Sequence, residues 1–419
     1  MDFKRWAATG GAAALVAAAA IVAVNVPWGG EGDATESTDA RPAPPPDPPD
    51  IGAERRIELQ RALNEVVVQG SSGAVAELVE RNEGGSDVWN GVAGVADRER
   101  GTPVDPDAHF RIASLSKPFV AATALLLVQD GSLELSDTLE DMLPGVVEGG
   151  QQITLRMLLS HTSGLYSYNK DMPSVVADPE RSWTPEELVE VSQRHRPVFP
   201  PATDVEYSNT NYVLVAMAIE RVTGRPYAEA VQERVIEPLG LEDTSIPFDS
   251  EMPEPVLRAY TRSHGSMVDI TEFNPTRWYG TAQVVSTVGD LNRFWRALLD
   301  GELLDEEMLE QMLTVQAEQE NGYGYALGPR SYTLTCGEQV WMHPGNIPGS
   351  RTWTVHGDDR DFTLFQARSA KDPDPPAWAM IELAMCPEEA PAEPEPSPST
   401  GDYPGEDVAG TGRGQDGGK

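Results

Sequence analysis

The placement of strand-like segments at both ends of the folded part of the chain is the feature that most constrains its architecture. Two runs near the start, 73–80 and 87–96, carry strand-like hydrophobic patterns broken by Gly-rich turns. Three short runs near the end, 339–342, 351–356 and 362–367, have strand-like patterns too. Helical patterns occupy the sequence between these two groups. The sequence therefore predicts one α/β unit whose strands come from both ends and which holds an inserted helical region.

Several helices can be placed from their end signals. The continuous apolar run 119–128 is stopped by Gly131. Thr184 opens a capping box with proline at the first helical position, so a helix starts there. A second apolar helix, 212–222, ends at Gly224. Further helical patterns occur at 54–68, 290–300 and 376–385.

The two ends of the chain differ from its body in composition. Residues 1–30 hold two basic residues followed by an uncharged run rich in Ala and Val, which predicts a signal peptide or an N-terminal membrane anchor. Residues 31–52 are an acidic, Pro-rich linker and 387–419 an acidic tail, and we expect both to be disordered. The folded domain is predicted to span 53–386. It would be extracellular, either secreted or anchored to the outer face of the cytoplasmic membrane.

Composition and missing motifs exclude several classes of function. The 67 acidic and 31 basic residues give a formal net charge of −36, which argues against a nucleic-acid partner and against docking on anionic lipid. Two cysteines cannot build a disulfide-dense scaffold or a four-thiolate zinc site. The six histidines have no metal-ligand spacing, and phosphate-loop, His-Glu-x-x-His and Gly-x-Ser-x-Gly motifs are missing. We therefore expect neither a metal nor a cofactor.

A Ser-x-x-Lys pattern occurs twice, and its context separates the two copies. Ser114 and Lys117 lie where a buried helix begins, so both side chains share one helix face and the amine can reach the hydroxyl. The helix start offers N–H groups to an oxyanion, and a lysine beside an apolar helix can serve as a base. Ser167 and Lys170 lie in a Gly/Tyr/Asn-rich loop without these features. The alternative for the first copy is a capping serine and a lysine that reaches solvent.

Two further motifs follow in order. Tyr207-Ser208-Asn209 opens the apolar helix 212–222, and His343-Pro344-Gly345 lies on a predicted strand. The set resembles the serine penicillin-recognising enzymes of the class C β-lactamase and D-alanyl-D-alanine carboxypeptidase kind. It is most similar to the secreted serine D-alanyl-D-alanine carboxypeptidases, and the likeness covers about 55–386. The resemblance implies a serine β-lactamase/DD-peptidase-like fold, with an antiparallel sheet flanked by helices and an inserted all-helical region.

The resemblance implies a role for each residue of the three motifs. Ser114 would be the acylated nucleophile, and Lys117 would take its proton with help from Tyr207. The phenol of Tyr207 would also protonate the leaving group and activate the deacylating water. Asn209 would hold the substrate's amide side chain and contact Lys117. His343 would be an electrostatic partner of Tyr207.

The likeness also implies residues that bind the substrate. The backbone N–H groups of Ser114 and Asn346 would form the oxyanion hole. Arg330 matches the position of an arginine that recognises the substrate's terminal carboxylate. Gly345 would belong to the substrate-binding strand. These residues would orient the scissile bond over the nucleophile.

The resemblance implies less specific roles for a few further residues. Trp278 and Tyr168 would be either walls of the cleft or packing residues, and His161 is expected to be structural. Cys336 and Cys386 match a pair that is bridged in the similar enzymes. A bridge would fit an exported protein.

One stretch departs from the family pattern. The family's His-Thr-Gly-Thr is His-Pro-Gly-Asn at 343–346, so both threonine hydroxyls that help bind the substrate carboxylate are missing. Losing a hydrogen bond to a charged group costs on the order of 1.5–3 kcal/mol. Acyl-enzyme chemistry is therefore predicted to persist, whereas carboxypeptidase specificity is open.

The predicted function is an exported serine acyl-enzyme hydrolase. The first choice is a D-alanyl-D-alanine carboxypeptidase acting on peptidoglycan stem peptides. A class C-like β-lactamase or an esterase would use the same residues, so both stay as alternatives. A further alternative is a penicillin-binding sensor that does not turn over. The partner would accordingly be a peptidoglycan peptide, a β-lactam or an ester, and we expect a monomer.

Overall fold

The computed structural model describes residues 50–319, 322–368 and 374–386. The predicted signal peptide or anchor, nearly all of the linker, and the acidic tail lie outside these residues, so they stay predictions. Within the described part, none of the helices combines the length and the apolar character that a membrane span requires.

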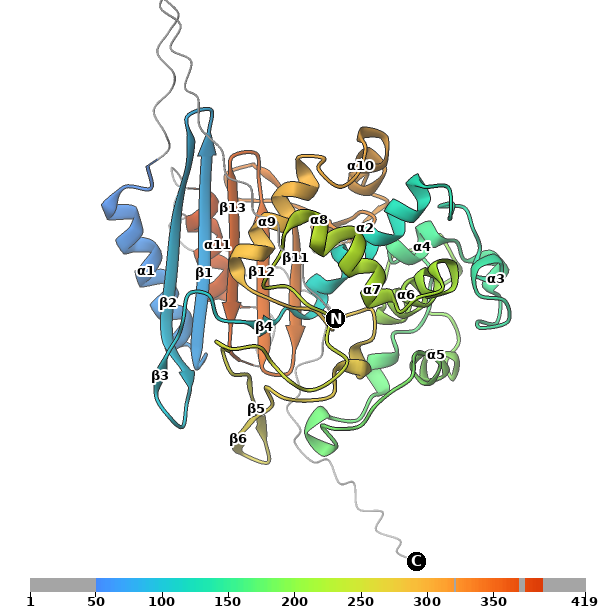
Figure 1. Ribbon diagram of the computed structural model, residues 1–419, viewed down its shortest axis with the longest axis horizontal. Coiled ribbons are helices and arrows are strands. Elements are labelled where there is room, and N and C mark those ends of the chain that lie inside the picture. The colour runs from blue at the N-terminus through green and yellow to red at the C-terminus, as the bar shows by residue number, and fades with distance from the viewer. Residues whose placement is uncertain (1–49, 320–321, 369–373, 387–419) are drawn as a thin grey trace, which may run out of the picture. The chain divides into compact units, whose positions relative to one another are not determined.

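The described residues form a nine-stranded antiparallel sheet in the order β3-β2-β1-β13-β12-β11-β10-β9-β8 (Figure 1). The last strand of the chain pairs with the first, with Val75 opposite Phe365 and Leu78 opposite Phe362. This pairing joins the two groups of strands that the sequence places far apart, so the predicted α/β unit is confirmed. The strands of this sheet are β1 (Gly73–Asn82), β2 (Gly85–Asp97), β3 (Thr102–Pro103), β8 (Ala317–Glu318), β9 (Gly324–Tyr325), β10 (Arg330–Thr333), β11 (Gln339–Ile347), β12 (Ser350–His356) and β13 (Arg360–Gln366).

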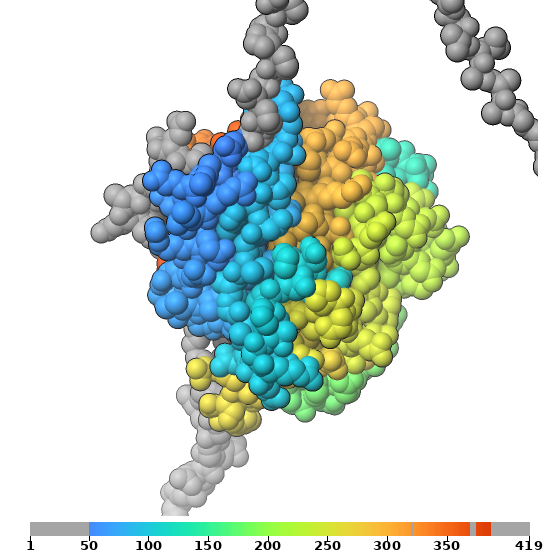
Figure 2. Space-filling view, turned by 60° about the vertical axis from the view of Figure 1, so that its left-hand side comes forward, coloured from blue at the N-terminus to red at the C-terminus, as the bar shows by residue number. Residues whose placement is uncertain are grey.

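Helices cover both faces of the sheet. On one face, α1 (Ala53–Val68) and α11 (Pro375–Met385) pack against each other and against strands. On the other face, α9 (Val288–Leu299) contacts β1 and β13, and Figure 2 shows it beside the N-terminal strands. Successive side chains of β1 point to opposite faces, so Ala74 joins the core under α1 and Val75 joins the core under α9.

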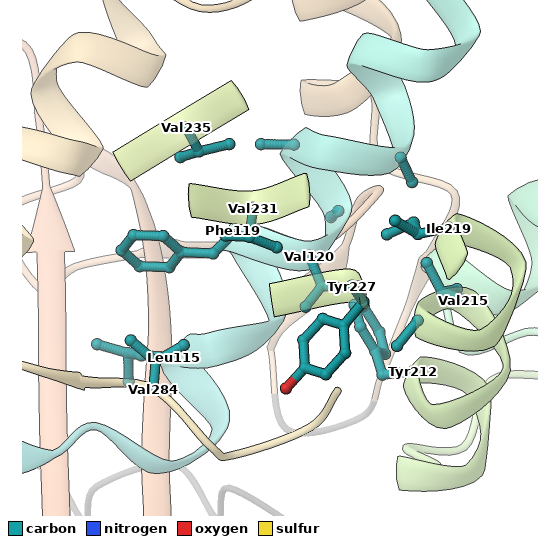
Figure 3. Packing of buried hydrophobic residues seen from close by; sticks show 14 of the residues in the cluster. Leu115, Phe119, Val120, Tyr212, Val215, Ile219, Tyr227, Val231, Val235 and Val284 are labelled. Carbon is teal, nitrogen blue, oxygen red and sulfur yellow. The ribbon is translucent and has the colours of Figure 1, made fainter. Parts of the chain in front are cut away.

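The inserted helical region is built around α2 (Ser116–Gln129) and α6 (Asn209–Thr223). Most residues of both helices are buried, as their continuous apolar sequences predict. Figure 3 shows Phe119 and Val120 of α2 in the same cluster as Val215 of α6. The two helices pack against each other.

The predicted helix ends are present. Thr184 caps α5 in a capping box, and Gly224 ends α6 with φ 69°, a left-handed value that glycine adopts without strain. The other helices are α3 (Leu139–Met142), α4 (Leu155–Leu159), α5 (Pro185–Gln193), α7 (Tyr227–Val231), α8 (Glu237–Leu239) and α10 (Glu306–Leu313).

Two small ladders and one covalent link complete the fold. β4 (Phe110–Arg111) pairs with β7 (Val285–Ser286), and β5 (Tyr260–Ser263) pairs with β6 (Ser266–Asp269). Cys336 and Cys386 form a disulfide, as expected. The link ties the turn before β11 to the end of α11.

Candidate active site

Ser114 lies in a short 3-10 turn, Ala113–Leu115, directly before α2. Ala113 has φ 56°, a left-handed value that costs a residue with a side chain on the order of 1–2 kcal/mol. The hydroxyl of Ser116 holds this conformation, because it donates to Ala113 O at 2.8 Å and accepts from the N–H of Val284 at 3.1 Å. The strained turn before the candidate nucleophile is therefore fixed by neighbouring contacts.

The amine of Lys117 contacts the hydroxyl of Ser114. The Lys117 side chain is fully buried, and its Nζ lies 3.0 Å from Ser114 Oγ. The same Nζ donates to Thr281 O at 3.0 Å. It also lies 4.8 Å from the centroid of the Tyr207 ring. The structure thus brings together three residues that the sequence motifs nominate, and adds a carbonyl that the motifs do not.

Tyr207 and Asn209 flank the start of α6. The N–H of Asn209 donates to Ser167 Oγ at 2.8 Å, and the N–H of Ser208 donates to His161 Nδ1 at 3.1 Å. Tyr207 and Asn209 are both buried, with 5% and 4% of their surface exposed. The backbone between Tyr207 and Asn209 is therefore held by the side chains of His161 and Ser167 from the preceding loop. The contact predicted between Asn209 and Lys117 stays a prediction.

Strand β11 lies directly against the Ser114 turn. A Cβ atom on Gly345 would come within 2.4 Å of Ile112 O and 2.9 Å of Leu115 Cδ1. Glycine is therefore required there, because any side chain would push the strand from the turn. The next residue, Asn346, pairs with Arg351 of β12. This places its backbone beside the nucleophile turn, while its role in an oxyanion hole stays a prediction.

His343 is buried on β11, with its ring centroid 6.3 Å from that of Tyr207. Its Nδ1 lies 2.7 Å from Pro344 O, which can only accept, so Nδ1 carries the proton. Burial lowers the pKa of His343 well below its ordinary value, and the positive charges of Arg330 and Lys117 lower it further. His343 is therefore neutral at neutral pH.

His161 packs on Tyr207, a contact that the spacing of the motifs does not predict. Its ring centroid lies 4.4 Å from that of Tyr207, and its Nδ1 accepts from Ser208. Burial lowers the pKa of His161 well below its ordinary value, and Arg330 and Lys117 add to this effect. The run 160–166 stands out in the sequence, but it does not reveal that His161 packs on Tyr207.

Arg330 lies at the start of β10 and is fully buried. Its Cζ is 4.7 Å from the centroid of the Tyr207 ring, 4.6 Å from that of Tyr325 and 5.3 Å from that of Tyr323. The guanidinium thus lies against the candidate acid/base residue. Recognition of a substrate carboxylate by Arg330 stays a prediction.

Trp278 and Tyr168 are both buried. Trp278 is 3% exposed and belongs to a core cluster with Ala113 and Ile347. Tyr168 is fully enclosed, and its hydroxyl donates to Arg277 O at 2.7 Å. This geometry is that of packing residues beside the nucleophile turn, and a role as cleft walls stays a prediction. In the described part of the chain, His, Cys, Asp and Glu side chains form no cluster that could hold a metal ion.

The family follows from a comparison with known proteins. The family model described as Beta-lactamase matches residues 61–376. The chain belongs to this family.

Members and neighbours of the β-lactamase family are similar over most of this chain. A solved D-stereospecific amidohydrolase from Streptomyces sp. is 36% identical, covers 81% of this chain and 99% of its own, and has a TM-score of 0.72. The D-amino acid amidase from Ochrobactrum anthropi SV3, complexed with L-phenylalanine amide, is 30% identical, with 76% and 93% covered and a TM-score of 0.69. Penicillin-binding protein 4* of Bacillus subtilis (strain 168) is 26% identical over 326 residues, 72% of this chain and 70% of that protein. The protein is accordingly a serine hydrolase of the β-lactamase family.

Proposed function

We propose that the protein hydrolyses amides of D-amino acids through an acyl-enzyme on Ser114. The observation that carries the proposal is the 3.0 Å contact between Ser114 Oγ and Lys117 Nζ inside a buried site. A nucleophile within hydrogen-bond reach of a base is the arrangement that covalent catalysis needs.

The reaction would proceed in two halves. Ser114 Oγ attacks the amide carbonyl while its proton passes to Lys117, and the phenol of Tyr207 gives a proton to the departing amine. The serine ester that remains is then attacked by water, whose proton returns through Tyr207. The ester bond to Ser114 breaks and the acid product leaves, while the proton held by Lys117 returns to Ser114 Oγ and restores the serine hydroxyl. The N–H groups of Ser114 and Asn346 would hold the oxyanion in both halves.

The buried aromatic cluster supports the proton transfers. Tyr207 has the nitrogen of Lys117 and the guanidinium of Arg330 close to its ring. Positive charge close to a phenol stabilises its phenolate form, which eases proton exchange. The two neighbouring histidines are neutral because their pKa values are lowered, so they do not compete as cations.

Two observations favour D-amino-acid amides as the substrate class. Two solved structures that are similar to this chain are a D-stereospecific amidohydrolase and a D-amino acid amidase, at 36% and 30% identity. In addition, the stretch 343–346 lacks the two threonine hydroxyls that would bind a substrate's terminal carboxylate. An amide substrate has no carboxylate at that end, so it does not need them.

A second candidate is a D-alanyl-D-alanine carboxypeptidase. The likeness to penicillin-binding protein 4* favours it, and Arg330 supplies a positive charge near Tyr207. A terminal carboxylate would have to reach that buried guanidinium. We rank this candidate second for that reason.

The test compares substrates on the wild-type protein and on Ser114→Ala. We expect release of ammonia from D-phenylalanine amide, much slower release from L-phenylalanine amide, and none from the variant. A faster reaction on a D-Ala-D-Ala peptide would instead support the carboxypeptidase. Rapid hydrolysis of a penicillin would indicate a β-lactamase, and preference for a simple ester would indicate an esterase. A stable penicilloyl adduct without turnover of any substrate would indicate a sensor.

We also propose that the protein acts outside the cytoplasm. The disulfide between Cys336 and Cys386 supports this, since such bonds persist in oxidising compartments. Fractionation of a producing cell, with antibody detection, tests the proposal. Recovery of the protein in the cytoplasm alone would contradict it.

A further inference from the structure

The carbonyl of Thr281 accepts a hydrogen bond from the candidate base, Lys117, at 3.0 Å. It belongs to the segment 277–284, here called the carbonyl loop, which runs from Arg277 to Val284. Because Lys117 contacts both Ser114 and this carbonyl, the position of the loop contributes to the direction of the amine. A neutral amine that donates one N–H to Thr281 O can turn its lone pair toward the hydroxyl of Ser114. What holds the loop is therefore part of the mechanism.

The loop lies tightly on α6. Gly280 has φ 68°, and a Cβ atom there would come within 2.6 Å of Tyr212 O and 2.7 Å of the Cβ of Ala216. The hydroxyl of Thr281 donates to Trp278 O at 3.0 Å, which fixes the turn of the loop. Close packing and this internal bond limit how far the carbonyl of Thr281 can move.

Tyr227 binds the loop next to that carbonyl. The Tyr227 hydroxyl accepts from the N–H of Gly280 at 3.2 Å and donates to Gln283 Oε1 at 2.6 Å. Gln283 in turn donates through Nε2 to Pro247 O at 2.6 Å. In Figure 3 the Tyr227 hydroxyl points away from Val215 and Ile219. One phenol thus contacts the loop on both sides of Thr281.

The hydroxyl keeps both roles over the whole assay range. Tyr227 and Gln283 are buried, and burial raises the pKa of Tyr227. The phenol therefore stays protonated, so that it continues to donate to Gln283 while it accepts from Gly280.

We propose that Tyr227 is a positioning residue for catalysis: through Gly280 and Gln283 it holds the carbonyl of Thr281 where that carbonyl orients Lys117 toward Ser114. This rests on the proposed function, in which Lys117 is the base. Tyr227 itself touches neither the substrate nor the reacting atoms. The competing explanation is that Tyr227 only packs the core, where it contacts Tyr279 at 4.8 Å between ring centroids.

The test variant is Tyr227→Phe in the full chain, assayed on the D-amino-acid amide that wild type turns over. We expect kcat to fall about 10-fold with KM nearly unchanged, since small misplacement of a catalytic group can cost up to about 100-fold. The acid limb of the pH–kcat profile should also move to lower pH. A carbonyl acceptor favours the charged amine, so loosening it lowers the pKa at which Lys117 becomes a base.

A matched control is Tyr260→Phe. Tyr260 is also a buried residue, and its hydroxyl accepts from the backbone N–H of Arg98 at 3.0 Å, but it lies on β5. This variant loses a comparable bond and should keep the wild-type kcat and acid limb. Equal behaviour of the two variants would overturn the proposal, because a purely structural role moves stability and not the pH profile.

A second variant keeps the proposal testable if Tyr227→Phe fails to fold. Gln283→Met removes the acceptor of the Tyr227 hydroxyl and should move kcat and the acid limb in the same directions. The chain has only five lysines, so ¹³Cε labelling of lysine allows Lys117 to be titrated by NMR and assigned with Lys117→Ala. An unchanged Lys117 titration in both variants would overturn the proposal.

The two proposals fail in different ways. Turnover that survives in Ser114→Ala would overturn the proposed function and with it this inference. Turnover that needs Ser114 but is indifferent to Tyr227→Phe and Gln283→Met would overturn this inference alone.

Discussion

The two Ser-x-x-Lys segments of this protein share a pattern and differ in everything that matters for catalysis. In the first, Lys117 is fully buried and contacts the hydroxyl of Ser114. In the second, Lys170 is 38% exposed on its side chain and pairs with Glu206. The hydroxyl of Ser167 donates to Asn169 Oδ1 at 2.6 Å, so it is engaged without the lysine. Four residues of sequence therefore do not define a nucleophile.

The difference comes from the surroundings. The first pair lies at the junction of a strained turn and a buried helix, where the amine has Thr281 O and a tyrosine ring around it. In the second pair, Ser167 is buried directly before a short 3-10 turn, Tyr168–Asp171, and Lys170 is exposed within that turn. Its serine still serves the site, because Ser167 Oγ accepts from the N–H of Asn209 at the start of α6. One segment would perform the chemistry while the other supports a neighbouring residue.

The largest expected effect is on activity, because only the first pair should be needed for turnover. We expect Ser114→Ala and Lys117→Ala to reduce kcat/KM by about 10⁴-fold, as loss of a nucleophile or its base does elsewhere. Lys170→Ala should stay within about twofold, since exposed ion pairs contribute little. Steady-state kinetics on a D-amino-acid amide checks this. A comparable loss in Lys170→Ala would contradict our distinction between the two segments.

The next largest expected effect is on stability and turnover, and it comes from the close approach of β11 to the first segment. Gly345→Ala would place a Cβ atom 2.4 Å from Ile112 O, so β11 or the turn must shift. We expect a loss of about 1–3 kcal/mol in the free energy of unfolding, together with reduced turnover. Gly52→Ala is the control, because a Cβ atom there meets nothing within 4 Å. Denaturant unfolding would measure both, and equal effects would refute the steric argument.

The buried histidines near the first segment, His161 and His343, should also make stability depend on pH. The pKa values of His161 and His343 are lowered by burial and by nearby cations, so the unfolded chain binds protons more readily than the fold. Their contribution is fully present above the unfolded pKa of about 6.5 and is lost as pH falls below it. We expect Tm to fall between pH 7.5 and pH 5.5, and to fall less in His161→Asn and His343→Asn.

Lys170→Ala is the control for that measurement. Its pair with Glu206 is exposed, so the variant should keep the wild-type dependence of Tm on pH. A wild-type Tm that is flat over this pH range would contradict the role given to the two histidines.

The smallest expected loss of unfolding free energy comes from substitutions in the second segment. Ser167→Ala removes the acceptor of the Asn209 N–H in a buried place and should cost about 1 kcal/mol of unfolding free energy. Lys170→Ala should cost at most about 1 kcal/mol and nearly nothing at high salt. Unfolding at two salt concentrations separates them. A larger, salt-dependent loss in Lys170→Ala would mean that the ion pair matters more than its exposure suggests.

Local patterns predicted several elements of this fold. Thr184 opens α5 and Gly224 closes α6 as their residue types require, because capping depends on the few residues around a helix end. The five strand-like runs all became strands of one sheet. The strands near Ser350 and Arg360 begin slightly earlier than their apolar patterns, since backbone pairing continues through polar residues.

The site was predicted less completely. The three motifs nominate Ser114, Lys117 and Tyr207, and the fold brings them together. Thr281 was not predicted, because its contribution is a backbone carbonyl that any residue could supply. Tyr227 was not predicted either, since an aromatic residue in an apolar helix looks like ordinary core.

The sequence by itself determined the capped ends of α5 and α6, which segment could hold an acyl-enzyme serine, and that the family's carboxylate-binding threonines are replaced at 343–346. Only the tertiary structure decided that Arg330 is enclosed against Tyr207, that His161 packs on the same ring, and that a carbonyl 164 residues from Lys117 accepts its hydrogen bond. The physical reason is the separation in sequence between the residues that interact. Helix caps and strand periods arise between near neighbours, whereas burial, charge and amine direction at this site arise from packing of segments that are distant in the chain.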